Sequence, residues 1–177
     1  MKRMNKIFIF TILFLTGTFA GFAQDDYFSG VEDTEDYSAL ELAQMDDRFS
    51  NFVEFLELSG LDLSVEFADD FTILMPTNEA FSEMEVDKLA YLSDPENRLE
   101  LIQLIKNHML PTKVMKYEFN ETQVANSAGD EEIVIGETGD VVYVGGAKIL
   151  ASDIEAEDAV IHVVDGVVEA TKDVTMD

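Results

Sequence analysis

The stretch that decides the fold spans residues 71–81 and reads Phe71-Thr72-Ile73-Leu74-Met75-Pro76-Thr77-Asn78-Glu79-Ala80-Phe81. Its first five residues are bulky and apolar or β-favouring, which predicts a short buried strand. Pro76 has no N–H to donate to a neighbouring strand, so the strand should end there. Thr77 offers the hydroxyl of a helix N-cap, and we expect Phe81 on the new helix to pack back beneath the strand. The stretch therefore predicts a strand, a turn and a helix start.

The residues before this stretch have helical periodicity. Within 38–58, apolar residues recur at the spacing of one helix face, as in Phe49, Phe52, Val53 and Leu56, and Gly60 is a natural stop. After the stretch, Ser93-Asp94-Pro95-Glu96 has the pattern of a second helix start. That helix should carry Leu99, Ile102 and Ile105, with Leu101 and Leu104 as further apolar residues. His108 lies on the same face, and Leu110-Pro111 ends the helix.

From residue 112 onward the apolar residues alternate, and β-branched residues are frequent, which is typical of strands. The predicted strands are 114–119, 132–135, 141–144, 148–150 and 160–164. Ile133 and Ile135 should face Val142 and Val144, or their neighbours, in a hairpin. Helices first and strands last indicate an α+β domain.

The N-terminus has the pattern of a secretory signal peptide. A basic start at Lys2, Arg3 and Lys6 precedes an apolar run over 7–15, and Gly21-Phe22-Ala23 suits a signal peptidase. The run is shorter than the roughly 20 residues that span a bilayer, and no later run is long enough. We therefore expect a signal peptide over 1–23 cleaved after Ala23, an acidic flexible lead over 24–37, one domain over 38–170 and a tail over 171–177. The exported protein would be secreted or periplasmic, with no direct membrane insertion after cleavage.

The charge composition limits the classes of partner that the protein could bind. The chain has 37 acidic and 11 basic residues, a net charge of −26, so nucleic acid and anionic lipid surfaces would be repelled. Cations, basic proteins and some glycans stay open as partners, although acidity that serves solubility alone is the simpler interpretation. The chain has no cysteine, so an exported form must be stabilised by packing without disulfides.

Residues 71–81 are similar to the first signature of the fasciclin domain, an extracellular adhesion module. The family's second signature resembles Gly146-Ala147-Lys148-Ile149, then Asp153-Ile154-Glu155-Ala156, then Val160-Ile161-His162-Val163-Val164-Asp165. The resemblance covers about residues 38–168 in a single copy. It implies a wedge-shaped fasciclin-type β-sandwich with helices packed at one side. The residues that carry this structural signature are Phe71, Thr72, Pro76, Thr77, Ala80, Phe81, Ile161, His162, Val163 and Asp165.

The resemblance also implies a candidate partner surface. Asn107-His108 stands where the family usually has a Tyr-His pair, a region implicated in receptor binding by animal members. The candidate binding residues are Asn107, His108, Met109, Leu110 and Pro111. Because asparagine replaces the tyrosine, the aromatic part of that surface is missing. We expect the ring of His108 to be buried and hydrogen-bonded to backbone near Pro76 or Thr77.

No residue pattern indicates catalysis or a resident metal or cofactor. His108 and His162 each lie among apolar neighbours, and no serine stands in a nucleophile-elbow motif. The acidic runs Asp46-Asp47, Asp69-Asp70 and Asp130-Glu131-Glu132 lack the alternating ligands and central glycine of a calcium loop, so we interpret them as solvated loops.

The resemblance implies a non-catalytic extracellular protein that acts in cell adhesion or matrix interaction, with a protein or glycan as its partner. The alternative is an extracytoplasmic carrier for a small ligand or a cation, which would need a pocket with a few inward polar groups. An enzyme ranks last, because no nucleophile–base pair can be named.

Overall fold

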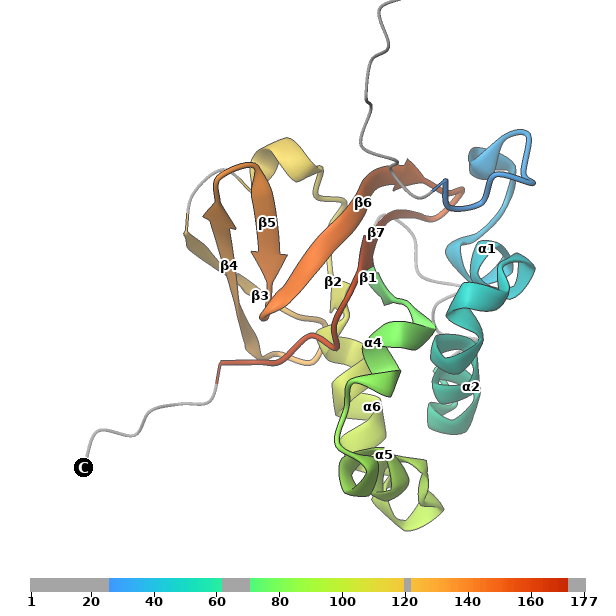
Figure 1. The fold of residues 1–177 in the computed structure, drawn as a ribbon, viewed down its shortest axis with the longest axis vertical. Helices are drawn as coiled ribbons and strands as arrows, with labels where there is room; N and C mark the ends of the chain where they lie inside the picture. Colours follow the sequence, from blue (N-terminus) through green and yellow to red (C-terminus); the bar gives the residue numbers. More distant parts are fainter. Residues whose placement is uncertain (1–25, 62–70, 120–121, 172–177) are drawn as a thin grey trace, which may run out of the picture.

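The structure, a computed structural model, describes residues 26–61, 71–119 and 122–171 (Figure 1). The predicted signal peptide, Asp69-Asp70 and all of the tail after Thr171 lie outside the described residues. The α-helices are α1 (Ala39–Met45), α2 (Ser50–Ser59), α4 (Asn78–Ser82), α5 (Val86–Ser93) and α6 (Arg98–Asn107). The strands are β1 (Phe71–Pro76), β2 (Met109–Leu110), β3 (Gln123–Asn126), β4 (Glu132–Thr138), β5 (Val141–Val144), β6 (Ala147–Glu155) and β7 (Ala159–Val164).

The strand, turn and helix start predicted for residues 71–81 are confirmed. Strand β1 ends at Pro76, and the Thr77 hydroxyl accepts from the Ala80 N–H at 3.4 Å at the start of α4. Phe81 is buried, and its ring lies 5.0 Å from that of Phe55 on α2. The chain therefore turns back under its own strand.

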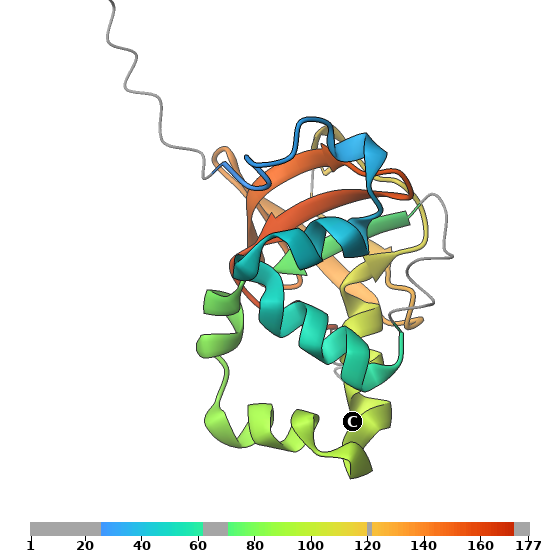
Figure 2. The same cartoon turned by 90° about the vertical axis from the view of Figure 1, so that its right-hand side faces the viewer.

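The strands form one mixed sheet of seven, in the order β2-β1-β7-β6-β5-β4-β3. Strand β6 joins the β3–β5 part of the sheet to the part that holds β1, β2 and β7. Its first residues pair with β5, and its later residues pair with β7 across register shifts. Figure 1 shows β4 and β5 on one side of β6 and the helices on the other, and Figure 2 shows the helices in front of the sheet. The predicted α+β class is thus confirmed, and in place of two separate sheets the expected sandwich is a single bent, nearly barrel-shaped sheet.

The two signature segments lie side by side. Strand β1 pairs in parallel with β7, with Ile73 opposite Ile161 and Leu74 opposite His162. Both strands are buried throughout. Ile73 and Ile161 face a core shared with the helices, whereas Leu74 faces a second core inside the bent sheet. A strand buried on both faces needs the continuous apolar run that the sequence shows.

Two expectations about elements are wrong. Residues 114–119 hold a 3-10 helix (Lys116–Glu118) instead of a strand, because the Lys116 N–H is taken by the side chain of Asp153 at 2.6 Å. On α6 the core residues are Leu101 and Ile105, and Leu99 is 78% exposed. Leu99 and Leu101 lie about 200° apart around the helix, and the face that packs inward is the one that carries Leu101 and Ile105.

The lead predicted to be flexible is packed against the domain from Asp26 onward. Phe28 is only 5% exposed, and its ring stacks on Phe49 at 5.3 Å. The Tyr37 carbonyl accepts from the Glu157 N–H at 2.9 Å, which ties the end of the lead to the β6–β7 turn. The aromatic residues in this acidic segment contribute enough burial to order it.

Candidate functional site

A groove of about 840 Å³ lies where α5 and α6 meet the start of β4 and the segment 167–171 that follows β7. Its walls include Tyr91 of α5 and Asn107 of α6. It contains more volume than the second pocket of the described residues, about 510 Å³, beside the N-terminal lead. A cavity of this size falls in the range of sites that hold a drug-sized ligand.

Asn107 anchors one wall through hydrogen bonds on both ends of its amide. Its Nδ2 donates to a Glu131 carboxylate oxygen at 2.9 Å, and its Oδ1 accepts from the Ser127 hydroxyl at 3.1 Å and from Gln103 Nε2 at 3.2 Å. Gln103 Nε2 also lies within hydrogen-bond distance of the Gly129 carbonyl, 3.0 Å away. The turn before β4 is thereby held against α6, so this wall is formed before any ligand arrives.

His108 holds the second wall. Its Nδ1 donates to the Leu104 carbonyl at 2.8 Å, and its Nε2 accepts from the Val168 N–H at 3.0 Å. Complete burial lowers the pKa of His108 to about 4, so the ring is neutral and suited to one donor and one acceptor role. The segment after β7 is therefore pinned to the end of α6. As expected, the ring is buried, but its partners are Leu104 and Val168 and not backbone near Pro76 or Thr77.

Gly145 permits the close approach of the same segment. Its φ is +56°, and a Cβ there would lie 2.6 Å from Val168 Cγ1 and 2.7 Å from the Glu169 carbonyl oxygen. The Glu169 N–H donates to the Gly145 carbonyl at 3.0 Å. Only glycine combines this backbone conformation with room for the neighbouring chain.

Acidic side chains dominate the charged part of the groove. Carboxylates come from α6, from the turn before β4, from β4 and from the C-terminal segment: Glu100, Asp130, Glu131, Glu132 and Glu169. Lys88 is the basic residue of the lining, and its Nζ lies 3.2 Å from Glu169 Oε1. The Tyr91 hydroxyl donates to Glu100 at 3.2 Å. The pKa of Tyr91 is raised, mainly by partial loss of solvent around its hydroxyl and to a smaller extent by the hydrogen bond to Glu100.

His162 lies inside the bent sheet and does not reach the groove. Its Nε2 donates to the Val114 carbonyl at 2.8 Å, and its Nδ1 accepts from the Asp153 N–H at 3.2 Å. Burial lowers the pKa of His162. Thr72 bridges the same loop, donating to the Thr112 carbonyl and accepting from the Val114 N–H, both at 2.8 Å. These signature residues hold the loop 112–114 across the open end of the sheet.

The candidate partner residues are separated by the fold. Asn107, His108 and Leu110 are buried, Met109 is half-buried and Pro111 is exposed. Asn107 lines the groove, whereas Leu110 packs into the core inside the sheet. A partner that approaches this stretch from outside therefore meets Pro111 and part of Met109.

The remaining signature residues are structural. Phe71, Pro76, Ala80, Phe81, Ile161 and Val163 are buried in or beside the helix-facing core. Asp165 is half-buried, and its carboxylate accepts from the Lys148 N–H at 2.7 Å. This contact fixes the chain where it leaves β7.

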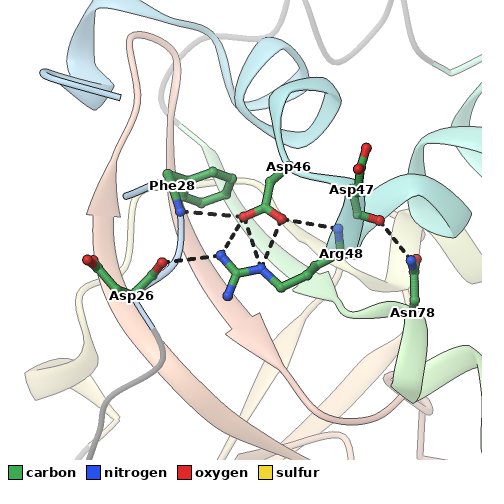
Figure 3. Close-up of polar contacts among 6 residues, drawn as sticks. All are labelled: Asp26, Phe28, Asp46, Asp47, Arg48 and Asn78. Atoms are coloured by element: carbon green, nitrogen blue, oxygen red, sulfur yellow. Dashed lines mark hydrogen bonds and ion pairs between the residues drawn. The ribbon is translucent and has the colours of Figure 1, made fainter. Parts of the chain in front are cut away.

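In the acidic pair Asp46-Asp47, the Asp46 carboxylate and the Asp47 backbone carbonyl make protein contacts (Figure 3). The Asp46 carboxylate accepts from Arg48 Nη2 at 2.6 Å, and this bond lowers the pKa of Asp46. Arg48 also donates to the Asp26 carbonyl at 3.2 Å, and its guanidinium lies 4.3 Å from the Tyr27 ring centroid. Asp46 and Arg48 therefore help to hold the lead. Across the ranges that the structure describes, no cluster of three or more His, Cys, Asp or Glu residues could hold a metal ion.

Comparisons with known proteins agree with this architecture. The fasciclin domain model matches residues 47–170, and the chain therefore belongs to the fasciclin domain family. The chain is 29% identical over 129 residues to protein sll1483 of Synechocystis, covering 73% of this chain and 71% of that protein. It is 31% identical over 130 residues to human periostin, covering 72% of this chain but only 15% of periostin.

Solved structures show the same fold. A pair of FAS1 domains from the insect cell adhesion molecule fasciclin I superposes with a TM-score of 0.66 at 15% sequence identity. The match covers 78% of this chain and 53% of that one. Among the described residues, no helix is both long enough and apolar enough to cross a membrane.

Sequence reasoning missed most of the groove. Asp130-Glu131-Glu132 was interpreted as a solvated loop, and Tyr91, Glu100 and Glu169 had no assigned role. The acidic run itself was a visible signal, but its position opposite α6 depends on contacts such as Asn107 to Glu131, 24 residues apart. Only the tertiary structure brings these carboxylates to one concave surface.

Proposed function

We propose that this chain is an exported, non-catalytic module that attaches to a protein or glycan at a cell surface or in a matrix, with the groove between α5, α6 and residues 167–171 as its docking site. Family membership supports the adhesive role, because a solved relative is a cell adhesion molecule. The N-terminal pattern supports export.

The single observation that carries the docking site is the prearranged groove. Hydrogen bonds from Asn107 and His108 fix its two walls, so little ordering entropy is lost when a partner binds. Tyr91 stands at the groove with 47% of its surface exposed. Tyrosine is among the side chains that most often dominate binding energy at interfaces.

The test compares attachment of the purified protein to cell envelopes and matrix for two matched double variants. Tyr91→Ala with Glu100→Lys alters the groove. Tyr143→Ala with Glu137→Lys makes the same chemical changes on the exposed β4–β5 hairpin. We expect the groove variant to lose attachment about tenfold, as for an aromatic anchor, and the hairpin variant to attach like the parent.

A third variant, Pro111→Arg, probes the exposed end of the stretch 107–111. Attachment lost only in this variant would place docking beside β2 and overturn the groove assignment. Absence of attachment in the parent protein would overturn the adhesive role itself.

A carrier for a small ligand is favoured by one observation, the volume of the same groove. That function predicts a melting temperature that rises with ligand concentration in the absence of any surface. Thermal unfolding of the protein against small cationic metabolites checks it, and an unchanged melting temperature would exclude them as cargo.

A further inference from the structure

We infer that the groove recognises a basic, partly apolar peptide segment of a partner protein, in which Lys or Arg residues are spaced by apolar ones. This inference rests on the proposed function and names the partner chemistry of its docking site. Three features of the groove carry it: the sign of its charge, the spacing of its carboxylates and its apolar floor.

The charge of the groove selects a cation. The carboxylates of Glu100, Asp130, Glu131, Glu132 and Glu169 contribute five negative charges against the single positive charge of Lys88. Lys88 and Glu169 are both exposed, so their ion pair is weak and open to exchange with an incoming cation. Like charge disfavours phosphates, acidic glycans and acidic peptides at this surface.

The spacing of the carboxylates selects several cations over one. They come from α6, from the turn before β4, from β4 and from the segment after β7, and among the described residues no group of three or more His, Cys, Asp or Glu side chains could hold a metal ion. The carboxylates therefore offer positive groups several separate points of contact instead of one shared metal site. A chain with Lys or Arg at intervals supplies such partners, whereas a single ion or a monovalent small molecule supplies one.

The floor of the groove adds apolar contact. Leu104 of α6 is partly exposed there, Leu92 of α5 and Val168 after β7 add small patches, and Tyr91 stands at one side with 47% of its surface exposed. The aliphatic stems of Lys and Arg lie well along such surface while their charged ends reach the carboxylates. An arginine or lysine can also lie over the exposed Tyr91 ring. A volume of about 840 Å³ admits a few residues of extended chain.

The experiment titrates the purified protein with a blocked hexapeptide that alternates Lys and Leu, and measures binding by calorimetry at low and at moderate salt. Peptides with Gln or Glu in place of Lys are the ligand controls. We expect the Lys peptide to bind, its affinity to fall as salt rises, and the Gln and Glu peptides to bind at least about tenfold more weakly.

A matched pair of triple variants locates the site. Glu100→Gln, Asp130→Asn and Glu132→Gln remove three of the five negative charges of the groove while leaving Glu131 with Asn107 and Glu169 with Lys88. Glu137→Gln, Asp140→Asn and Glu155→Gln remove the same charge from exposed positions outside the groove. We expect about tenfold weaker binding only in the groove triple. Equal losses in both triples would show attraction to the net charge alone and overturn the inference.

Competition separates this inference from the proposed function. If surface attachment depends on the groove but the Lys peptide does not compete with it, the adhesive role stands and the basic partner is wrong. If the peptide binds in the groove and the protein attaches to no surface, the basic recognition stands and the adhesive role is wrong.

Discussion

At the scale of single residues, the two histidines act as hydrogen-bonding bridges inside the fold. Each uses one ring nitrogen as a donor and the other as an acceptor, which only the neutral ring can do. Protonation would turn the acceptor nitrogen toward a backbone N–H as a second donor. The cores around His108 and His162 are therefore sensitive to acid.

The first prediction concerns this sensitivity. The pKa of His108 falls from 6.5 to about 4 on folding, so the unfolded chain binds the proton first as the pH drops. The contribution of the neutral His108 ring to the unfolding free energy is fully present above pH 6.5. It should decline by roughly 3 kcal/mol as the pH falls toward 4. Urea unfolding of the parent and of His108→Gln across this range measures the difference in slope. Parallel pH profiles for the two proteins would contradict the prediction.

The second prediction concerns Thr72, whose hydroxyl satisfies the Thr112 carbonyl and the Val114 N–H. Thr72→Val keeps the shape but leaves both groups without this partner, and should cost about 2 kcal/mol of unfolding free energy. Thr72→Ser keeps the hydroxyl and serves as the control, with a smaller loss from the missing methyl group. The hydroxyl has no such role if the valine variant proves as stable as the serine variant in chemical denaturation.

At the scale of elements, the segment 71–81 organises more than its own strand and helix. Helix α2 begins after Phe49 without a side-chain cap of its own. Asn78 supplies one from α4, accepting from the Asn51 N–H at 3.0 Å and donating to the Asp47 carbonyl at 2.8 Å, a contact seen in Figure 3. Two helices that are distant in sequence therefore start against each other.

The third prediction tests this shared cap. Asn78→Ala removes the acceptor for the Asn51 N–H, and the unfolding free energy should fall by about 1 kcal/mol, as for other lost caps. Asn126→Ala, an exposed change on β3, is the matched control and should stay within about 0.5 kcal/mol of the parent. Thermal or urea unfolding distinguishes them. If Asn78→Ala lowers the unfolding free energy no more than Asn126→Ala does, Asn78 does not stabilise the start of α2.

At the scale of the whole molecule, the bent sheet separates two cores, and the N-terminal lead completes the helical one. Phe28 belongs to that core together with Phe49 and Phe52. Arg48 and Asp46 hold the lead in place from the α1–α2 connection (Figure 3). The folded unit therefore starts at least as early as Phe28 and not at residue 38.

The fourth prediction follows from this boundary. Phe28→Ala should lower the unfolding free energy by about 3 kcal/mol, because a buried ring in contact with Phe49 is lost. Tyr117→Ala removes an aromatic ring that is 75% exposed and should change stability by less than about 0.5 kcal/mol. Urea unfolding of both variants checks the comparison. Similar stabilities would mean that the lead contributes little to the fold.

The sequence by itself determined the β1–α4 unit, the buried strand β7 and the α+β class, and the resemblance of its two signature segments indicated the fasciclin family. The structural features rest on local chemistry: a proline that has no N–H to donate, a threonine that caps a helix, and apolar runs that need burial on both faces. Burial of His108 was also predictable, since it follows an apolar helix.

Only the tertiary structure decided the partners of His108, the docking of the lead and the groove. The contact between His108 and Val168 joins residues 60 apart, and no local pattern encodes such a pairing. In the sequence, the carboxylates of Glu100, Glu132 and Glu169 are far apart, and each is typical of a separate solvated charge. They form one acidic surface because the bent sheet brings β4 and residues 167–171 next to α6. Such long-range packing is the sum of many contacts that no short segment specifies.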